Sequence, residues 1–339
     1  MRIALAGFGT VGQAFVRMLD ERRGDLYTRH GLKPMLVAVG DSGGAVVAAG
    51  GLDAAALLAV KRDGTSVATL PGGRAGAAAI GTLLAESGAE VLVEVAPSDW
   101  ADPQPATQRL MAALRGGCHV ISVNKAPLAT AMGPLREMAR HNGVALRFSG
   151  TVGAGSPMLA VARHCICGDE VLEILAAANG TTNYILWRMH AQGASFDEAL
   201  REAQQRGYAE TDPSADVDGI DLAAKVVILS NAVLGQSLTL ADVPVEGIRD
   251  ISPERVAEAA KRGKRIRLVG VCGAVAAVRP MEIDAGGPLD TPESLNAMLV
   301  RMRYSGELVL RGRGAGGHET ATAIMRDLVE LWHDHGAPS

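Results

Sequence analysis

A glycine-rich turn directly after the first apolar segment constrains this chain more than any other feature. Residues 2–6 are apolar apart from Arg2, and Gly7-Phe8-Gly9-Thr10-Val11-Gly12 follows them. The next stretch, 14–23, places its apolar side chains on one helical face. A strand, a Gly-x-Gly-x-x-Gly turn and an amphipathic helix in this order indicate a dinucleotide-binding unit.

Each glycine of this turn has a physical reason to be a glycine. Gly7 permits the tight turn, Gly9 lets a pyrophosphate approach the backbone, and Gly12 lets the helix pack closely on the strand. Free N–H groups and a partial positive charge at the helix N-terminus favour the phosphates. The alternative is a glycine-rich turn without a ligand, but the flanking strand and helix favour the dinucleotide.

The sequence leaves the choice between NAD and NADP open. Asp41 follows the second predicted strand, where an acidic side chain accepts hydrogen bonds from an adenosine ribose and repels a 2′-phosphate. Lys61 and Arg62 follow the next predicted helix and instead offer positive charge to a 2′-phosphate. Asp41 has a second interpretation, as a turn residue that stabilises its own backbone.

The first half of the chain alternates apolar strands with amphipathic helices. The pattern predicts strands at 2–6, 35–39, 90–96, 119–123 and 144–148, and helices at 14–23, 52–61, 105–114 and 135–141. This rhythm predicts an α/β fold of the Rossmann type, with a doubly wound parallel sheet and helices on both of its faces.

The second half changes character after a connector of small residues at 149–157. Strands are predicted at 171–176, 267–278 and 307–310, a broken helical run at 184–234, and a last helix at 320–332. We expect a dinucleotide-binding domain at 1–130 plus 311–339 and a second, α+β domain for substrate binding and dimerisation at 131–310. The active site is expected in the cleft between the two.

Composition excludes several classes of protein. The formal net charge is -4 and aromatic residues make up 3%, which argues against a nucleic-acid partner. No stretch is long and apolar enough for a membrane span, and the N-terminus does not resemble a signal peptide. Four cysteines do not make a disulfide scaffold, so we expect a soluble, cytoplasmic protein. Cys165 and Cys167 follow His164 without zinc-site spacing and are interpreted as ordinary thiols in or near a core.

Acidic residues gather in one short segment of the second half, namely Glu210, Asp212, Asp216, Asp218 and Asp221. Asp221 and Lys225 stand four residues apart at the start of a predicted helix, so they share a face. The following residues are almost purely apolar, which places Lys225 at the rim of a core. The alternative is a solvated acidic loop with one surface ion pair, worth a few tenths of a kcal/mol.

This segment resembles the signature of the homoserine dehydrogenase family. The signature runs from Ala203 through Gly207, Tyr208 and the aspartates to Lys225. Further family motifs appear in order along essentially the whole chain: the turn at 7–12, Asn124-Lys125, the run 151–155, the run 180–186 and Gly314-Ala315-Gly316. Several spaced motifs in the right order make a chance match very unlikely.

The resemblance implies NAD(P)-dependent hydride transfer between L-homoserine and L-aspartate 4-semialdehyde, in threonine and methionine biosynthesis. Lys225 is then the proton donor to the aldehyde oxygen, and Lys125 is a second candidate for proton transfer. Glu210 and Asp221 match the carboxylates that bind homoserine, and the substrate residues further include Gly180, Thr181 and Tyr208. The chemistry agrees, because a developing alkoxide needs a cation and a proton, and a substrate ammonium needs carboxylates.

The family further implies cofactor contacts outside the N-terminal turn, and a homodimer. The implied contacts are Ala96, Pro97, Lys125, Gly207 and Gly314. Many members hold a monovalent cation with the help of a Glu where this chain has Ser149. Without that Glu, sodium is expected on the backbone carbonyls of Val152, Ala154 and Ser156. We expect a short form without a regulatory ACT domain.

Two other functions are compatible with the same fold. One is a paralogous dehydrogenase that acts on another small amino-acid aldehyde or keto acid. The other is a dinucleotide-binding sensor without catalysis. The sensor is disfavoured because Lys125, Asp221 and Lys225 are all present.

Overall fold

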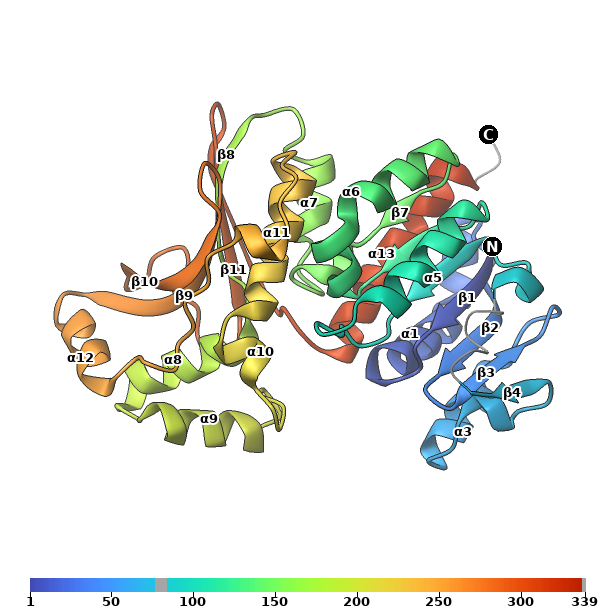
Figure 1. The fold of residues 1–339 in the computed structure, drawn as a ribbon, viewed down its shortest axis with the longest axis horizontal. Coiled ribbons are helices and arrows are strands. Elements are labelled where there is room, and N and C mark those ends of the chain that lie inside the picture. Colours follow the sequence, from blue (N-terminus) through green and yellow to red (C-terminus); the bar gives the residue numbers. More distant parts are fainter. Residues whose placement is uncertain (77–83, 337–339) are drawn as a thin grey trace. The chain divides into compact units, whose positions relative to one another are not determined.

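The computed structural model describes residues 1–76 and 84–336, and the chain forms two compact units (Figure 1). The first comprises Met1–Thr151 and Gly316–Ser339, and the second Val152–Ala315. The expected boundaries at 130/131 and 310/311 are therefore displaced. Residues after 130 stay in the first unit, because α6 (Lys125–His141) packs on α5 (Gln104–Arg115) and β7 (Leu146–Arg147) adds to the first sheet. Residues 311–312 belong to a strand of the second sheet.

The first unit is built around a seven-stranded sheet with the order β4-β3-β2-β1-β5-β6-β7. β1, β2, β5, β6 and β7 are parallel, which confirms the Rossmann-type prediction. β3 and β4 form an antiparallel edge beside β2 that the sequence pattern did not predict. The remaining strand bounds are β1 (Arg2–Ala6), β2 (Met35–Asp41), β3 (Gly44–Val47), β4 (Gly73–Ala75), β5 (Val91–Glu94) and β6 (His119–Ser122).

Successive residues of a strand point to opposite faces of the sheet, and helices of the first unit pack on the apolar side chains there. Ile3 and Leu5 of β1 share one apolar cluster with Phe15 of α1 (Thr10–Glu21) and Leu328 of α13 (Gly317–His335). α13 packs against α1 although the two are separated by almost the whole sequence, and Figure 1 shows the red helix among the blue and green elements. The other helices are α2 (Arg23–His30) and α3 (Ala54–Arg62), and two 3-10 turns lie at Val67–Thr69 and Ser149–Thr151.

The second unit contains a five-stranded antiparallel sheet with the order β10-β9-β8-β11-β12. Its bounds are β8 (Val171–Ala177), β9 (Lys264–Cys272), β10 (Ala277–Asp284), β11 (Asn296–Met302) and β12 (Gly306–Gly312). The single strand predicted at 267–278 is in fact two strands, because the chain turns back between Cys272 and Ala277. β11 was not predicted.

Helices cover one face of this second sheet. α8 (Gly180–Gln192), α11 (Ile220–Val233) and α12 (Pro253–Lys261) all contact β9. The other helices are α7 (Met158–His164), α9 (Phe196–Gln205) and α10 (Ser214–Val217), with a 3-10 turn at Leu240–Asp242. No described helix is long and apolar enough to cross a bilayer.

The opposite face of the second sheet is apolar. A separate cluster contains Val269, Ala297 and Leu299, with partly buried Leu175, Val271, Met281 and Ile283 packed against it. Gly270 faces α11, since a Cβ there would lie 2.5 Å from Val226, so its neighbours Val269 and Val271 point the other way. No described helix of this unit belongs to the cluster.

We predict that Leu328→Ala destabilises the first unit by about 2–5 kcal/mol, because the side chain is fully buried where α13 packs on α1. Denaturant unfolding followed by circular dichroism measures the change. Thr322→Ala, on the exposed side of the same helix, is the control and should stay within about 0.5 kcal/mol of the parent. Equal effects at the two positions would contradict a core role for α13.

Candidate active site

The N-terminal glycine turn has the geometry that a dinucleotide requires. Gly7 has a φ of +106°, and a Cβ there would lie 2.6 Å from the backbone nitrogen of Ala96. At Gly12 a Cβ would lie 2.4 Å from the carbonyl oxygen of Gly7, so α1 packs directly on the turn. At Gly9 a Cβ would meet no atom within 4 Å, which leaves open space beside the backbone. The three predicted roles therefore match three different local environments.

The start of α1 presents backbone N–H groups beside this open space. Gly9 is the N-cap residue and provides no side-chain cap, and the first turn contains no acidic residue. The unpaired N–H groups and the helix dipole then favour an anion. Phe8 is buried, whereas Thr10 is exposed and Val11 half-buried. These residues fit a pyrophosphate.

The carboxyl ends of β5 and β6 are tied together at the same edge of the sheet. Asn124 donates a hydrogen bond to the carbonyl of Pro97 at 3.3 Å and also caps α6. The backbone N–H of Lys125 donates to Ser98 Oγ at 2.9 Å. With Ala96 against Gly7, four of the predicted residues come together where dinucleotides bind in such sheets: Gly7, Ala96, Pro97 and Lys125.

Asp41 is turned into the protein. Its side chain is 5% exposed and accepts hydrogen bonds from Lys61 Nζ (2.6 Å), Ser66 Oγ (2.6 Å), Gly43 N (2.9 Å) and Val67 N (3.1 Å). Burial alone would raise the pKa of this carboxyl, but the four donors hold it below its usual value. The local role predicted as the alternative, a residue that stabilises its own turn, is therefore present. Lys61, the predicted phosphate-binding residue, is its ion-pair partner.

In the second unit, Asp221 and Lys225 form the predicted pair on one face of α11. Lys225 Nζ lies 2.6 Å from Asp221 Oδ2 and 2.7 Å from the carbonyl oxygen of Ala178. Lys225 is 6% exposed, so the pair lies at the core and is not a surface ion pair. A buried ammonium is costly unless it is paired and hydrogen-bonded.

Asn179, which the sequence interpretation missed, and Thr181, which it named, complete this arrangement. Asn179, between β8 and α8, donates to Asp216 Oδ1 at 2.7 Å and to Asp221 Oδ2 at 3.0 Å. The Thr181 hydroxyl lies 2.8 Å from Asp216 Oδ2 and 2.7 Å from the carbonyl of Tyr208. Asn179 directly precedes the motif at 180–186, and an Asn before a helix start is itself an N-cap signal.

The acidic segment divides into inward and outward residues. Asp216 and Asp221 take part in the partly buried network around Asn179, whereas Asp218 pairs with Arg249 at the surface. Asp212 accepts a hydrogen bond from the N–H of Ser214, and hydrogen bonds from Ser214 lower the pKa of Asp212. Glu210 is exposed, and no described residue is seen to donate to its carboxylate. It stands two residues after Tyr208, whose ring packs against Tyr184 in a tilted arrangement with centroids 4.8 Å apart.

Gly207 and Gly314 both have local structural reasons to be glycine. Gly207 has a φ of +74° directly after α9, where the chain leaves the helix. At Gly314 a Cβ would lie 1.6 Å from the amide nitrogen of Asn296, so the loop packs against that side chain. Asn296 is fully buried, and neither of its amide atoms has a hydrogen-bond partner among the described residues. Such a group is a candidate to meet a ligand or water.

The connector at the start of the second unit forms a tight turn. Gly153 has a φ of +80° and Ala154 a φ of +42°, and the N–H of Ser156 donates to the carbonyl of Gly153 at 2.7 Å. The carbonyl of Ser156, one of three predicted sodium ligands, already accepts from the N–H of Met158. The described residues contain no cluster of three His, Cys, Asp or Glu side chains that would suit a metal.

The placement of Cys165 and Cys167 in or near a core was wrong. Both are free and exposed, because only Ile166 between them points inward. The short turn after α7 places i and i+2 on the same, outer side.

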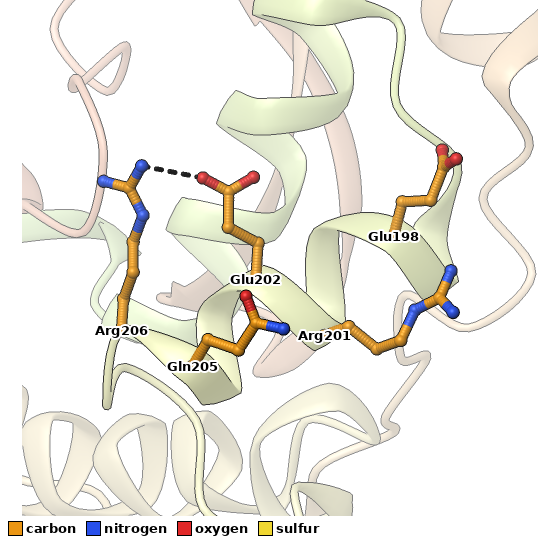
Figure 2. A pocket seen from close by; sticks show the side chains of 5 residues that line it. All are labelled: Glu198, Arg201, Glu202, Gln205 and Arg206. Carbon is orange, nitrogen blue, oxygen red and sulfur yellow. Dashed lines mark ion pairs between the residues drawn. The ribbon is translucent and has the colours of Figure 1, made fainter.

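A hollow of about 500 Å³ lies along α9 (Figure 2), and neither Asp221 nor Lys225 lines it. One helix supplies its whole lining, which is polar or charged: Glu198, Arg201, Glu202, Gln205 and Arg206. Arg206 pairs with Glu202, which also binds Arg188 and the Tyr184 hydroxyl. This exposed groove has none of the features of a catalytic site. Its residue Glu202 joins α9 to α8 through Arg188 and Tyr184.

Comparisons with known proteins agree along the whole chain. A family model described as "Homoserine dehydrogenase, NAD binding domain" matches residues 7–149, and one described as "Homoserine dehydrogenase" matches 157–329. The homoserine dehydrogenase of Methanocaldococcus jannaschii is 36% identical over 98% of this chain and 99% of its own length. The NAD(+)-dependent homoserine dehydrogenase of Pseudomonas canavaninivorans is 34% identical over 97% and 96%.

Solved structures give the same result. A homoserine dehydrogenase from Thiobacillus denitrificans superposes with a TM-score of 0.85 at 29% identity and covers 100% of this chain and 76% of that one. A hyperthermophilic archaeal homoserine dehydrogenase in complex with NADPH has a TM-score of 0.86 at 27% identity, with coverages of 100% and 98%. Both the NAD(+)-dependent relative and the NADPH complex are thus similar to this chain.

We predict that Asp41→Asn lowers the free energy of unfolding near neutral pH and leaves NAD affinity within about threefold, because the carboxylate serves internal donors. A carboxyl whose folded pKa is lowered stabilises the fold above about pH 4. The difference between parent and variant should therefore shrink as the pH falls through the lowered pKa. Denaturant unfolding across pH and NAD titration measure both effects. A large loss of NAD affinity with unchanged stability would instead assign Asp41 to the ribose.

Proposed function

The chain belongs to the homoserine dehydrogenase family, and from this premise we propose how its residues carry out the reaction. In the reducing direction, the carbonyl carbon of L-aspartate 4-semialdehyde gains a hydride and its oxygen gains a proton, which yields L-homoserine. The nicotinamide of NADH or NADPH supplies the hydride when bound. The protein must bind the amino acid, hold a cation beside the carbonyl oxygen and deliver the proton.

The observation that carries the proposal is the environment of Lys225. Its ammonium has three N–H donors, and two of them are directed at Ala178 and Asp221. The third is left for the carbonyl oxygen of the substrate. Lys225 therefore stabilises the developing alkoxide and donates the proton to it. Lys125, at the start of α6, is the second candidate for this transfer.

Carboxylates bind the ammonium group of the substrate in this proposal. Asp221 is held next to Lys225, and Glu210 exposes a carboxylate without a described donor. Gly180 and Thr181, at the N-terminus of α8, offer backbone N–H groups and a positive dipole end to the substrate carboxylate. Tyr208 stands two residues before Glu210 and completes the substrate residues.

Backbone atoms bind the cofactor in this proposal. The turn at 7–12 and the start of α1 bind the pyrophosphate, and Ala96, Pro97 and Lys125 line the same sheet edge. Gly207 and Gly314 are the proposed contacts from the second unit, and the unpartnered amide of Asn296 beside Gly314 supports the latter. Sodium on the backbone carbonyls of Val152, Ala154 and Ser156 is an additional ligand to test, because carbonyl oxygens are hard ligands that suit such a cation.

A homodimer is part of the proposal, with the apolar face of the second sheet as the contact surface. Leu175, Val271 and Leu299 lie side by side across three strands of that face. Val309, next to Leu299 on β12, is 38% exposed. A contiguous apolar face of this kind suits a self-complementary contact about a twofold axis. We also assign the protein to the cytoplasm, where exposed thiols such as Cys165 and Cys167 stay reduced.

We predict that Lys225→Met lowers kcat for aspartate-semialdehyde reduction by about 10²–10⁴-fold and leaves NADPH affinity nearly unchanged. Methionine keeps the apolar stem and removes only the ammonium group. Lys264→Met, which removes an exposed lysine paired with Asp284, is the control and should keep full activity. Cofactor oxidation at saturating substrate measures kcat. Turnover within about threefold of the parent would remove Lys225 from the mechanism.

For the dimer we predict that the parent sediments at twice the 35.1 kDa chain mass, whereas Leu175→Arg sediments as a monomer. An arginine at this half-buried position introduces an unpaired charge into an apolar contact. Val275→Arg, at a position that is 69% exposed in the turn between β9 and β10, is the control and should stay dimeric. A monomeric parent, or a dimeric Leu175→Arg variant, would contradict the proposed surface.

A further inference from the structure

We propose that Asn179 is a positioning residue for the reaction: its side-chain amide fixes the Asp216 and Asp221 carboxylates and, through Asp221, the ammonium of Lys225. The inference rests on the proposed role of Lys225. Asn179 lies where β8 ends and α8 begins, and its side chain is 3% exposed.

The amide of Asn179 uses its full hydrogen-bonding capacity, two donors and two acceptor sites. Its Oδ1 accepts from the backbone N–H of Thr182 at 2.9 Å and lies 3.1 Å from the Thr182 hydroxyl. Its Nδ2 donates to Asp216 at 2.7 Å and to Asp221 at 3.0 Å. Because an N–H of Thr182 must meet an oxygen, the orientation of the amide is fixed and its NH₂ group must face the two carboxylates.

The two halves of the amide serve different purposes. The oxygen caps α8, a role that Ser, Thr or Asp also performs. Only an amide adds donors on the other side, and a cap alone does not need them. The two amide N–H groups donate to the carboxylates of Asp216 and Asp221 and so hold together two negative groups that repel each other. Capping therefore explains half of the contacts of Asn179, and the remaining half points to the reaction.

Asp221 is the link between Asn179 and the proton donor. Its Oδ2 accepts hydrogen bonds from both the Asn179 amide, at 3.0 Å, and the Lys225 ammonium, at 2.6 Å. The carbonyl oxygen of the neighbouring Ala178 accepts a second hydrogen bond from the Lys225 ammonium at 2.7 Å. Two consecutive residues, Ala178 and Asn179, thus determine where the third ammonium proton points. The Asn179 amide is one of the restraints on Asp221, so we expect its loss to disturb the alignment of Lys225.

Asp216 connects Asn179 to the segment that carries Glu210. Its Oδ2 lies 2.8 Å from the Thr181 hydroxyl, which lies 2.7 Å from the carbonyl of Tyr208. Gln204 donates to the carbonyl of Glu210 at 3.2 Å from the other side. The bridge from Asn179 through Asp216 therefore also restrains the backbone two residues before Glu210.

The experiment compares Asn179→Asp and Asn179→Ser in the full-length protein. Both replacements keep an oxygen that caps α8, and both remove the amide donors. We expect kcat to fall by about 10- to 100-fold in each, as for a misaligned proton donor. The melting temperature of Asn179→Ser should stay within about 5 °C of the parent, and the NADPH dissociation constant of both variants within about twofold. If Asn179 served only as a cap, these two variants would keep both the melting temperature and kcat of the parent, because each keeps a capping oxygen.

Two controls make every outcome decisive. Ser252→Ala removes the cap of α12 and should lower the melting temperature with kcat unchanged. Parent kcat in both Asn179 variants, or a loss of activity that only follows their unfolded fraction, overturns the inference. If the parent does not reduce aspartate semialdehyde, or if Lys225→Met keeps its turnover, the proposed function itself fails, whatever the Asn179 variants do.

Discussion

The ion pair between Asp221 and Lys225 is the interaction on which the second unit depends. Both side chains are largely withdrawn from water, and a buried pair is stable only when further hydrogen bonds satisfy its remaining atoms. The carbonyl of Ala178 and the amide of Asn179 provide those bonds. The apolar residues of α11 pack on β9 and hold the pair at the β8–α8 junction.

The key feature of the first unit is a backbone turn rather than a network of side chains. The turn at 7–12 offers open space at Gly9 and close packing at Gly7 and Gly12, and each is available only without a Cβ. Asp41 and Lys61, which the sequence offered for the ribose and for a 2′-phosphate, form an ion pair with each other. In the proposed site, anion binding depends on N–H groups and a helix dipole, which suit the common part of NAD and NADP.

The parallel sheet and the contact between Asp221 and Lys225 could be predicted from the sequence, because both depend on local patterns. Strand and helix periods predicted the parallel sheet, and the spacing of Asp221 and Lys225 predicted their contact, which the structure confirms. The structure departs from the sequence where tertiary contacts decide. Asp41 turns inward toward Ser66 and Val67, and Asn179 meets Asp216 and Asp221 from more than thirty residues away. No periodicity encodes such partners. The exposure of Cys165 and Cys167 depends likewise on a turn after α7.

The most direct test of the account is a crystal structure of the protein with NADP(H) and L-homoserine bound. The account predicts the homoserine hydroxyl oxygen within hydrogen-bonding distance of Lys225 Nζ, about 2.7–3.2 Å, with the Lys225 bonds to Ala178 and Asp221 intact. A homoserine bound in catalytic orientation with its hydroxyl on another donor, and with Lys225 directed only at protein atoms, would contradict it.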